Sequence, residues 1–504
     1  MTKPHADKGG IQHCVTAEDL LAHSTSGSRE FSLALAGGGT IFCEEIVRNV
    51  PRKRFVCRGR WDNHDVYAKI FLGSQAQRYA RRDQAGMQAL SNAGILSPPL
   101  LYAGTDASGA AEVLIFQAIG NSSNAESVWE ALPPHSEERL NLAKRLIAAV
   151  AAHHNAGLMQ TDLYLKNFLL QGQQVFTLDG DAIRRLPFFF TRRTALNNLA
   201  LLLSKFDVMD VGNWLSSLLT VYAQARSWIY APDSHHMQKK IAVIRRRVVS
   251  KYADDKVFRE CTDIKVTRTR GQFQAVSRPY DGSLLGHALE NLDPLLEAAQ
   301  SQRLKSGNTC TVALAEIDNR KVVIKRYNVK NFWHGLGRAL RQSRAAISWS
   351  NAYRLQMHEI ATASPVALVE RHYGLIRRRA YFLAEYVDAP DIHDFFANAE
   401  VDETRKRIVA KNVAQLFYKL NLLKISHGDF KATNVKVVGE QPLLIDLDSM
   451  RQYKSPWLFE RRHLRDLRRF LRNWQQVPQT RMLLTEAFAK FYKNQRLLQR
   501  AGWV

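Results

Sequence analysis

The chain has 504 residues, of which 46% are hydrophobic, and it carries a formal charge of +24. The length exceeds that of one ordinary domain, so two or more are expected, and the hydrophobic content excludes a chain that is disordered throughout. The charge predicts an anionic partner such as nucleic acid, an acidic membrane leaflet or a phosphorylated ligand.

The ends and the cysteines indicate the compartment. Residues 1–30 are polar without periodicity and predict a loose tail that lacks a secretory signal pattern. No run of about 18 apolar residues predicts a transmembrane helix. The five cysteines are scattered without a CxxC pair, which argues against a disulfide framework and for a reducing compartment. We expect a soluble or peripheral cytoplasmic protein.

The first half of the chain predicts a hairpin, a helix, a strand and a second helix. Residues 54–71 alternate between polar and apolar, with a turn at Asp62-Asn63, and predict a β-hairpin whose second strand ends at Lys69. The elements expected after this hairpin are a helix at 74–94, a buried strand at 112–116 and a helix at 136–157.

The same order returns in the second half. Residues 309–327 predict a hairpin that ends near Lys325. The elements expected after it are a helix at 343–360, a strand at 380–386 and an amphipathic helix at 402–423 with Asp402 as its N-cap. The repetition predicts an α+β fold with two tandem domains, at 31–262 and 301–504, and a connector at 263–300.

Each copy continues into a loop that contains Asp and Asn. The loops are QTDLYLKN, with Asp162 and Asn167, and HGDFKATN, with Asp429 and Asn434. An apolar strand with an acidic end follows each loop, in VFTLDGD and LLIDLD. Asp179 lies 17 residues after Asp162, and Asp446 lies 17 residues after Asp429. This shared spacing is better evidence than either loop alone.

Asp, four residues and Asn is the spacing of the kinase catalytic loop. In that loop the Asp faces the acceptor hydroxyl, the Asn amide oxygen reaches a magnesium ion, and an Asp after the next strand holds the metal that bridges the phosphates. A lysine in the preceding hairpin neutralises the phosphates. The candidate sets are Lys69, Asp162, Asn167 and Asp179 in the first copy, and Lys325, Asp429, Asn434 and Asp446 in the second.

Each element alone has a simpler interpretation. A single Asp more often caps a helix or stabilises a turn, and Asp-x4-Asn occurs by chance in long chains. The ordered set, used twice, favours phosphoryl transfer. The later acids of the two strands, Asp181 and Asp448, either add a metal ligand or cap the next segment, and we favour the cap. We interpret the pair His153-His154 as structural.

HGDFKATN with LLIDLD, preceded by LKSGNTCTV and VVIKRY, resembles the lipopolysaccharide core kinase family (Kdo/WaaP, InaA-like). SRAAISWSNAYRL looks like the family's segment after the lysine strand, and the first copy is similar but more divergent. The resemblance implies two tandem protein-kinase-like domains, each with a small β-rich N-lobe and a mostly helical C-lobe. It also implies phosphorylation of an inner-core sugar, heptose or Kdo, on a lipid-linked acceptor, with ATP and Mg²⁺ as cofactors.

The sequence departs from the kinase pattern at the phosphate loop and the lysine partner. Only Gly59 and Gly307 stand in the turns where a glycine-rich loop covers the phosphates. The helix after the lysine strand lacks a Glu, and the nearest candidates by position are Asp83 and Ser348. These differences leave Lys69 or Lys325 with another partner.

Two further positions follow from the kinase pattern. Glu385-Tyr386 and Phe116-Gln117 fall where the adenine-contacting hinge would lie. Gln160 stands in the first loop where the second has His427, a residue that usually supports the loop by hydrogen bonding. We therefore expect the second copy to be catalytic and treat activity of the first as uncertain.

Basic residues cluster with aromatic residues at 327–344 and 455–474, and arginines flank Phe188, Phe189 and Phe190. Such segments suit a contact with anionic lipid. In the other interpretation the aromatic residues lie in a core and the arginines form a solvated face. We favour that for 455–474 and weigh both evenly for 327–344. No zinc spacing or helix-turn-helix signal appears, so nucleic acid is not expected as a partner.

The sequence as a whole predicts an ATP-dependent lipopolysaccharide kinase in the cytoplasm, peripheral on the inner membrane. Its expected partners are the lipid-linked core acceptor, the anionic membrane surface and other core-assembly enzymes. One rival is a pseudokinase that serves as a scaffold in core assembly. Another is a phosphotransferase that acts on a different small molecule or on a protein.

Overall fold

The computed structural model describes residues 30–50, 53–298, 302–306, 310–327, 342–373 and 376–503. The predicted tail up to residue 29, Gly307 and residues 328–341 of the second hairpin's basic extension lie outside these ranges. The chain divides into two compact units. Unit 1 contains the described residues up to Phe206 and Asp210–Ile241, and unit 2 contains Asp207–Met209 and the described residues from Ala242 onward.

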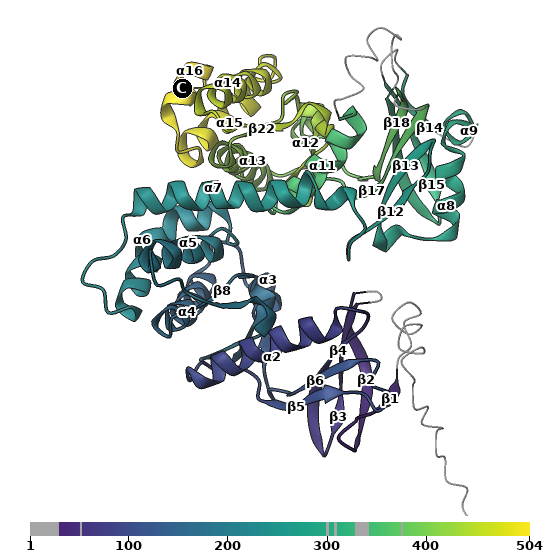
Figure 1. Cartoon of the computed structure of the whole chain (residues 1–504). Coiled ribbons are helices and arrows are strands. Elements are labelled where there is room, and N and C mark those ends of the chain that lie inside the picture. The colour runs from purple at the N-terminus through teal and green to yellow at the C-terminus, as the bar shows by residue number, and fades with distance from the viewer. Residues whose placement is uncertain are drawn as a thin grey trace, which may run out of the picture. The chain divides into compact units, whose positions relative to one another are not determined.

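Unit 1 begins with a six-stranded antiparallel sheet in the order β1-β2-β3-β4-β6-β5 (Figure 1). Its strands are β1 (Phe31–Ala34), β2 (Thr40–Val50), β3 (Arg54–Trp61), β4 (His64–Phe71), β5 (Leu100–Thr105) and β6 (Glu112–Gln117). The predicted first hairpin is confirmed as β3 and β4. Asp62 and Asn63 both have positive φ, as a two-residue turn between twisted strands requires.

The helix α2 (Ala76–Asn92) packs on this sheet, as Figure 1 shows, and confirms the predicted helix at 74–94. Its apolar face places Ala80, Met87 and Leu90 in one cluster with Leu114 and Phe116 of β6. The helix is therefore fixed beside β4, the strand that carries Lys69.

A helical region with short strands completes unit 1. Its helices are α3 (Ala125–Ala131), α4 (Glu137–Asn155), α5 (Thr191–Leu203) and α6 (Val208–Ala225), and its strands are β7 (Ser123–Asn124), β8 (Leu158–Gln160), β9 (Phe168–Gln171), β10 (Gln174–Thr177) and β11 (Ile183–Arg185). The predicted helix at 136–157 is confirmed as α4, whose first turn is capped by the Ser136 hydroxyl accepting from the Arg139 N–H. The helix α7 (Ser234–Ala253) begins in unit 1 and continues into unit 2.

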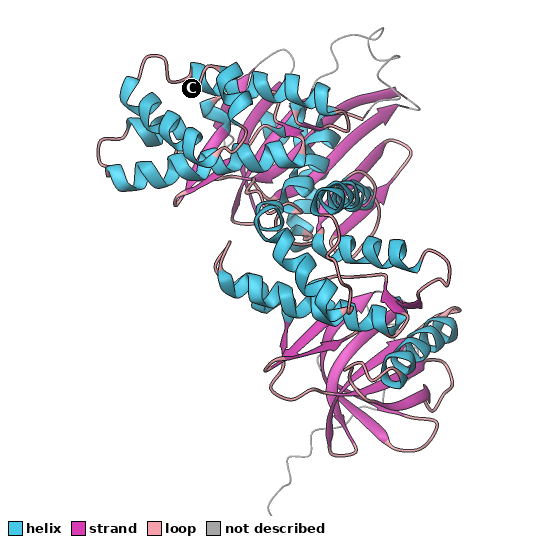
Figure 2. Cartoon of the chain, turned by 90° about the vertical axis from the view of Figure 1, so that its left-hand side faces the viewer, coloured by secondary structure: helices cyan, strands magenta, loops and turns pink. Residues whose placement is uncertain are grey.

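Unit 2 contains a seven-stranded antiparallel sheet in the order β12-β13-β17-β18-β16-β15-β14. Its strands are β12 (Ile264–Arg268), β13 (Gln272–Ser277), β14 (Gln302–Ser306), β15 (Cys310–Ile317), β16 (Arg320–Tyr327), β17 (Pro365–Tyr373) and β18 (Ile376–Glu385). The hairpin β15–β16 confirms the predicted one, with Asp318 and Asn319 as its left-handed turn. Figure 2 shows the strands in magenta and the helices in cyan.

The prediction that residues 263–300 form a connector is wrong. Residues 264–277 form β12 and β13, and β13 pairs with β17. The helices α8 (Ser283–Glu290) and α9 (Leu292–Glu297) then pack their leucines into the core of the same sheet. The segment looked like a linker because its glycines and Pro279 punctuate it, yet Ile264 and Ala275 are fully buried. The division between the units falls within α7 instead.

The helical region of unit 2 follows β18. Its helices are α11 (Arg344–Gln356), which packs on the sheet, α12 (Ile392–Ala397), α13 (Glu403–Leu423), α14 (Pro456–Arg472), α15 (Pro478–Phe491) and α16 (Gln495–Ala501). Short strands β19 (Ile425–Ser426), β20 (Val435–Val438), β21 (Gln441–Leu444) and β22 (Arg451–Gln452) frame the loop after α13. Asp402 caps α13 as predicted, accepting from the Arg405 N–H. Thus each unit joins a β-rich N-terminal part to a helical C-terminal part.

Candidate active sites

Lys69 lies in β4 and forms a buried ion pair with α2. Its Nζ donates to the Asp83 carboxylate at 2.6 Å and lies 3.6 Å from Asp179 Oδ1. Burial raises the pKa of Asp83, and the Lys69 ammonium opposes that rise. Asp83, the candidate chosen by position, therefore does pair with Lys69 in place of the missing Glu.

Two glycines hold α2 against the Asp179 loop. A Cβ added at Gly86 of α2 would overlap the backbone of Gly180, and one added at Gly180 would overlap the backbone of α2. Only residues without a side chain permit this approach. The contact also brings Arg82 of α2 to Asp181, and the two form an ion pair. Asp181 therefore pairs with Arg82 of α2. The structure does not show the role that we favoured from the sequence, a cap of the next segment.

The first Asp-containing loop is fixed by hydrogen bonds. Asn167 Nδ2 donates to the Asp162 carbonyl at 2.7 Å, and the Leu178 N–H donates to the Asn167 carbonyl at 2.8 Å. Gln160 Nε2 donates to the Leu178 carbonyl at 2.8 Å. These bonds set Asp162, Asn167 and the residue before Asp179 side by side.

A cavity of about 470 Å³ in unit 1 is lined by three of the predicted site residues, Lys69, Asn167 and Asp179. Phe116 and Gln117, predicted as the hinge, also line it. The volume lies within the range of small-molecule and cofactor sites. Beside it, burial and the Asp179 charge raise the pKa of Asp162.

The second loop repeats these bonds. Asn434 Nδ2 donates to the Asp429 carbonyl at 2.8 Å, and the Ile445 N–H donates to the Asn434 carbonyl at 3.0 Å. His427 Nε2 contacts the Ile445 carbonyl at 3.0 Å, as Gln160 contacts that of Leu178 in unit 1. Gln160 therefore reproduces the hydrogen bond of the histidine that it replaces, so glutamine at this position is compatible with activity of the first copy.

The acids after the two loops share one backbone conformation. Asp179 and Asp446 both have positive φ, at 67° and 61°. Each begins a 3-10 turn, at Gly180–Ala182 and Leu447–Ser449. The left-handed region is uncommon for residues other than glycine and is enriched at functional sites.

Lys325 in β16 has partners that differ from those of Lys69. It forms an ion pair with Asp446 and lies 3.4 Å from Asp448. Burial alone would raise the pKa of Asp446, but the Lys325 ammonium lowers it below its usual range. Arg344 Nη2, in the first turn of α11, holds Asp448 at 2.7 Å. Asp448 therefore pairs with Lys325 and Arg344. The cap that we favoured for Asp448 is also not shown by the structure.

Ser348, the candidate partner by position, does not contact Lys325 in the structure. Its hydroxyl contacts the Tyr327 hydroxyl at 3.1 Å instead. The serine hydroxyl thus pairs with another residue of the lysine strand, and the DLD aspartates replace the missing helix acid as partners of Lys325.

Strand register corrects the hinge correspondence by one residue. Val66 of β4 pairs with Gln117, and Val322 of β16 pairs with Glu385. Gln117 is therefore the counterpart of Glu385, and the predicted pair Phe116-Gln117 begins one residue early. The Tyr386 N–H donates to the Lys321 carbonyl at 2.9 Å.

Sequence reasoning missed Asp466, which lies on α14. Its carboxylate accepts from the Ser426 hydroxyl at 2.7 Å and from the N–H groups of His427 at 2.8 Å and Gly428 at 3.1 Å. Burial raises its pKa, and these donors oppose the rise. The signal was an acid on the apolar face of an otherwise basic helix. In unit 1, Asn198 of α5 holds the loop by donating to the Gln160 carbonyl at 2.8 Å.

Cations next to the loop aspartates were also missed. In unit 2, Arg469 Nη2 lies 2.6 Å from Asp429 Oδ1, and Lys431 Nζ lies 3.5 Å from the other oxygen. In unit 1, Tyr164 occupies the position of Lys431, and Lys205 Nζ lies 3.5 Å from the Tyr164 ring centroid. Burial lowers the pKa of Lys205 to about 8, and the Asp162 charge opposes this. Lys205 lies just after the end of α5, about forty residues from Asp162 in sequence, so no local sequence pattern predicts this proximity.

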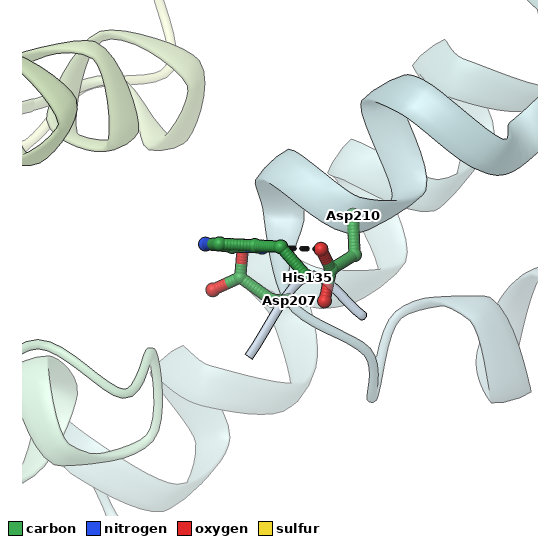
Figure 3. A group of neighbouring side chains, drawn as sticks. All are labelled: His135, Asp207 and Asp210. Atoms are coloured by element: carbon green, nitrogen blue, oxygen red, sulfur yellow. Dashed lines mark hydrogen bonds and ion pairs between the residues drawn. The ribbon is translucent and has the colours of Figure 1, made fainter. Parts of the chain in front are cut away.

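His153 and His154, which we interpreted as structural, contact protein groups. His153 Nε2 lies 2.9 Å from the Thr177 hydroxyl, and burial lowers the pKa of this histidine to about 4. His154 contacts Tyr222 at 2.8 Å. Within unit 1 the imidazole of His135 contacts the buried carboxylate of Asp210, at the start of α6, as Figure 3 shows. These contacts join α4 and the turn before it to neighbouring elements.

The basic segments have different outcomes. In α14, Phe459, Leu464, Leu467 and Phe470 are buried and most arginines are exposed, as the favoured interpretation of 455–474 predicts, but Trp457 is exposed. Most of 327–344 lies outside the described residues. Phe188, Phe189 and Phe190 are exposed. Within the described ranges, no helix is long and apolar enough to cross a membrane.

Each unit contains a strand lysine, a loop aspartate, an asparagine and a second aspartate, the set of side chains that a kinase-type phosphotransferase uses. The model of the lipopolysaccharide kinase (Kdo/WaaP) family matches residues 295–492, and this region of the chain is similar to that family. The family consists of lipopolysaccharide kinases, so the chain is an ATP-dependent phosphotransferase.

No curated protein matches the chain. One similar solved structure is described as "WaaP in complex with acyl carrier protein", with 17% sequence identity and a TM-score of 0.33. The alignment covers 45% of this chain and 90% of that one.

Proposed function

We propose that the chain is an ATP-dependent kinase that phosphorylates a sugar of the lipopolysaccharide inner core, heptose or Kdo. The acceptor is lipid-linked, and the reaction takes place at the cytoplasmic side of the inner membrane. One observation carries the proposal: the Lys, Asp, Asn and Asp set recurs in both units with equivalent loop hydrogen bonds, and the second set lies inside the family match.

We further propose that the two units are tandem protein-kinase-like domains. The strand order β2-β3-β4-β6-β5 in unit 1 corresponds to β14-β15-β16-β18-β17 in unit 2. In each sheet the site lysine lies three residues after the strand residue that pairs with the end of the hinge strand. This correspondence extends the kinase assignment to unit 1, which the family match does not include.

The residues at both sites fit Mg²⁺ and ATP. Asn167 and Asn434 each use the amide nitrogen to bind the loop backbone, which leaves the amide oxygen for a metal. With the carboxylates of Asp179 and Asp446 these are the oxygen ligands that Mg²⁺ prefers. Mg-ATP, when bound, supplies the γ-phosphoryl group.

The remaining steps belong to the chain's own side chains. Asp162 and Asp429 would orient the acceptor hydroxyl and receive its proton as its oxygen bonds to the γ-phosphorus, while the bond from that phosphorus to the bridging oxygen breaks and ADP leaves. Lys69 and Lys325 neutralise the phosphates. The raised pKa of Asp162 brings it nearer to neutral pH, where a base that accepts a proton works best.

A second function, binding without catalysis in one unit, has support from Arg469. The guanidinium of Arg469 lies 2.6 Å from the Asp429 carboxylate, on the group that must receive the hydroxyl proton. The position fits a resting state that the acceptor displaces, and it also fits a pseudokinase that serves as a scaffold for other core-assembly enzymes. The catalytic interpretation predicts that Arg469→Ala keeps turnover in unit 2 with a lower KM for the acceptor, because the guanidinium no longer competes for Asp429, whereas a scaffold shows no turnover in unit 2 with or without the arginine.

Mass analysis of the lipopolysaccharide core tests the proposal. Cells that carry Asp162→Ala, Asp429→Ala or both are compared with cells that carry the unchanged chain. We expect less phosphate on the core in each single variant and none of the chain-dependent phosphate in the double variant. Unchanged phosphate in the double variant would exclude the core-kinase function.

A further inference from the structure

Unit 1 exposes five large hydrophobic side chains in two loops. Phe188, Phe189 and Phe190, just before α5, are 90%, 75% and 75% exposed. Ile229 and Tyr230, between α6 and α7, are 89% and 79% exposed. Exposing apolar side chains of this size to water is unfavourable in free energy, and clusters of exposed apolar side chains mark interaction sites.

The two loops are neighbours. Arg192, in the first turn of α5, stacks over the ring of Trp228 with its Cζ 4.6 Å from the ring centroid. Trp228 directly precedes Ile229, and Arg192 follows Phe190 by two residues. The five exposed side chains therefore belong to one surface, which we call the aromatic face. Figure 1 shows α5 and α6 beyond α3 on the side away from the sheet of unit 1.

The surroundings of the aromatic face are basic. Arg185, Arg192 and Arg193 are exposed, and residues 182–206 contain no acidic residue. No described acidic side chain pairs with Arg185 or Arg193. The one acid of the second loop, Asp233, is engaged in capping α7, where it accepts from the His236 N–H at 2.7 Å. Exposed aromatic side chains beside Arg185 and Arg193, which no described acid pairs, match the interface of an anionic bilayer.

Stability of the fold does not account for these phenylalanines. Phe190 has a φ of 62°, a backbone conformation that suits glycine or asparagine better than an aromatic residue. Phe188 and Phe189 contact each other edge to face, with ring centroids 5.3 Å apart, and are otherwise open to water. We therefore infer that the three phenylalanines at this turn contact a partner and do not stabilise the fold.

We propose that the aromatic face docks unit 1 on an anionic lipid bilayer, with the five side chains in the headgroup region and Arg185, Arg192 and Arg193 on lipid phosphates. The proposal names the membrane-binding residues of a protein assigned to a lipid-linked acceptor. Its physical basis is independent of phosphoryl transfer, because apolar insertion and cation–phosphate contacts need no nucleotide.

Vesicle co-sedimentation of the full chain tests the proposal. Vesicles of phosphatidylcholine alone are compared with vesicles that also contain phosphatidylglycerol, and neither contains lipopolysaccharide. We expect strong binding to the anionic vesicles only, and binding that falls as salt is raised above about 0.1 M, where the screening length is about 10 Å.

Substitutions identify the face. We expect F188S/F189S/F190S to reduce the vesicle partition coefficient by about tenfold or more. The matched control L284S/V438S/M482S removes three exposed hydrophobic side chains of unit 2 and should leave binding unchanged. R185E/R193E should abolish the preference for anionic vesicles. Because all these side chains are exposed, the variants keep the core, and unchanged thermal unfolding verifies this.

Several outcomes overturn the proposal. These are wild-type protein that ignores anionic vesicles, and F188S/F189S/F190S that binds them as the wild type does. A third is lipid-free self-association, seen by sedimentation velocity and lost in F188S/F189S/F190S, which would assign the face to a second copy. Asp162→Asn should bind vesicles normally, so a failed kinase assay and a failed membrane assay are distinguishable.

Discussion

Lys69→Met tests how the buried pair with Asp83 contributes to unit 1. Asp83 is fully buried, and Lys69 Nζ lies 2.6 Å from its carboxylate. Removing the ammonium leaves an unpaired buried carboxylate, a change that costs about 3–5 kcal/mol. Asp83 recovers part of this cost by binding a proton. Burial already raises its pKa against the opposition of Lys69, so the pKa rises further in the variant.

The free energy of unfolding of the Lys69→Met variant should depend on pH through Asp83. A carboxyl group whose pKa is higher in the folded than in the unfolded chain stabilises the fold below its unfolded pKa, and that contribution is lost as pH rises toward the folded pKa. The free energy of unfolding of the Lys69→Met variant should therefore fall above about pH 4, by about 1.4 kcal/mol per pH unit until the folded pKa is passed. The wild type should show a shallower slope.

Hydrogen exchange in urea, followed on α2 peptides at several pH values, measures this free energy within unit 1, since a chain of two units need not unfold in one step. The control is Lys69→Met with Asp83→Leu. Replacing both partners by apolar groups should restore most of the stability and remove the added pH slope. A Lys69→Met variant with the wild-type slope, or a double variant no more stable than the single one, would refute the reasoning.

Substitutions at three further positions test the loop and the helix contact. Gln160→His should keep unit 1 activity within about threefold, and Gln160→Leu should lower it about tenfold or more, because leucine cannot donate to the Leu178 carbonyl. Both are measured in a chain that carries Asp429→Asn, so that only unit 1 contributes activity. Equal losses in both variants would contradict the role of this hydrogen bond. Lys205→Met should move the acid limb of the pH profile of kcat/KM for unit 1 to higher pH, because Lys205 lowers the pKa of Asp162. Lys205→Arg, which keeps the positive charge, should restore the wild-type profile. An acid limb that does not move in Lys205→Met would exclude an effect of Lys205 on Asp162. Gly86→Ala should destabilise unit 1 by about 1–3 kcal/mol because its Cβ overlaps the Gly180 backbone. Gly212→Ala, in open space on α6, should instead stabilise by up to about 1 kcal/mol in thermal unfolding, and equal effects of the two would argue against the packing claim.

Local patterns predicted most of the site. The Asp-x4-Asn spacing and the following apolar strand located both loops, because their hydrogen bonds join residues close in sequence. The hairpin turn at Asp62-Asn63 fixed the register that places Lys69. Position along the helix was enough to select Asp83, since α2 follows its strand directly.

Long-range contacts account for what was missed. The strands β12 and β13 appeared to be a connector because the partner of β13 is β17, about ninety residues later. Ser348 failed as a partner because its short side chain contacts Tyr327, while Lys325 reaches Asp446 from a distant loop. Asp466 and Lys205 approach their loops only after α14 and α5 have packed. The sequence shows at most that Asp466 lies on the apolar face of its helix, and it does not show which loop either side chain contacts.

The most direct test of the central claim measures transfer of labelled γ-phosphate from Mg-ATP to a lipid-linked core acceptor by the purified full chain. The variants are Asp162→Asn, Asp429→Asn and the double variant, each with matched folding by circular dichroism. Two active sites predict that each single variant retains part of the transfer and that the double variant loses it by about 10² or more. A double variant as active as the wild type would contradict the assignment of Asp162 and Asp429 as the residues that receive the acceptor proton.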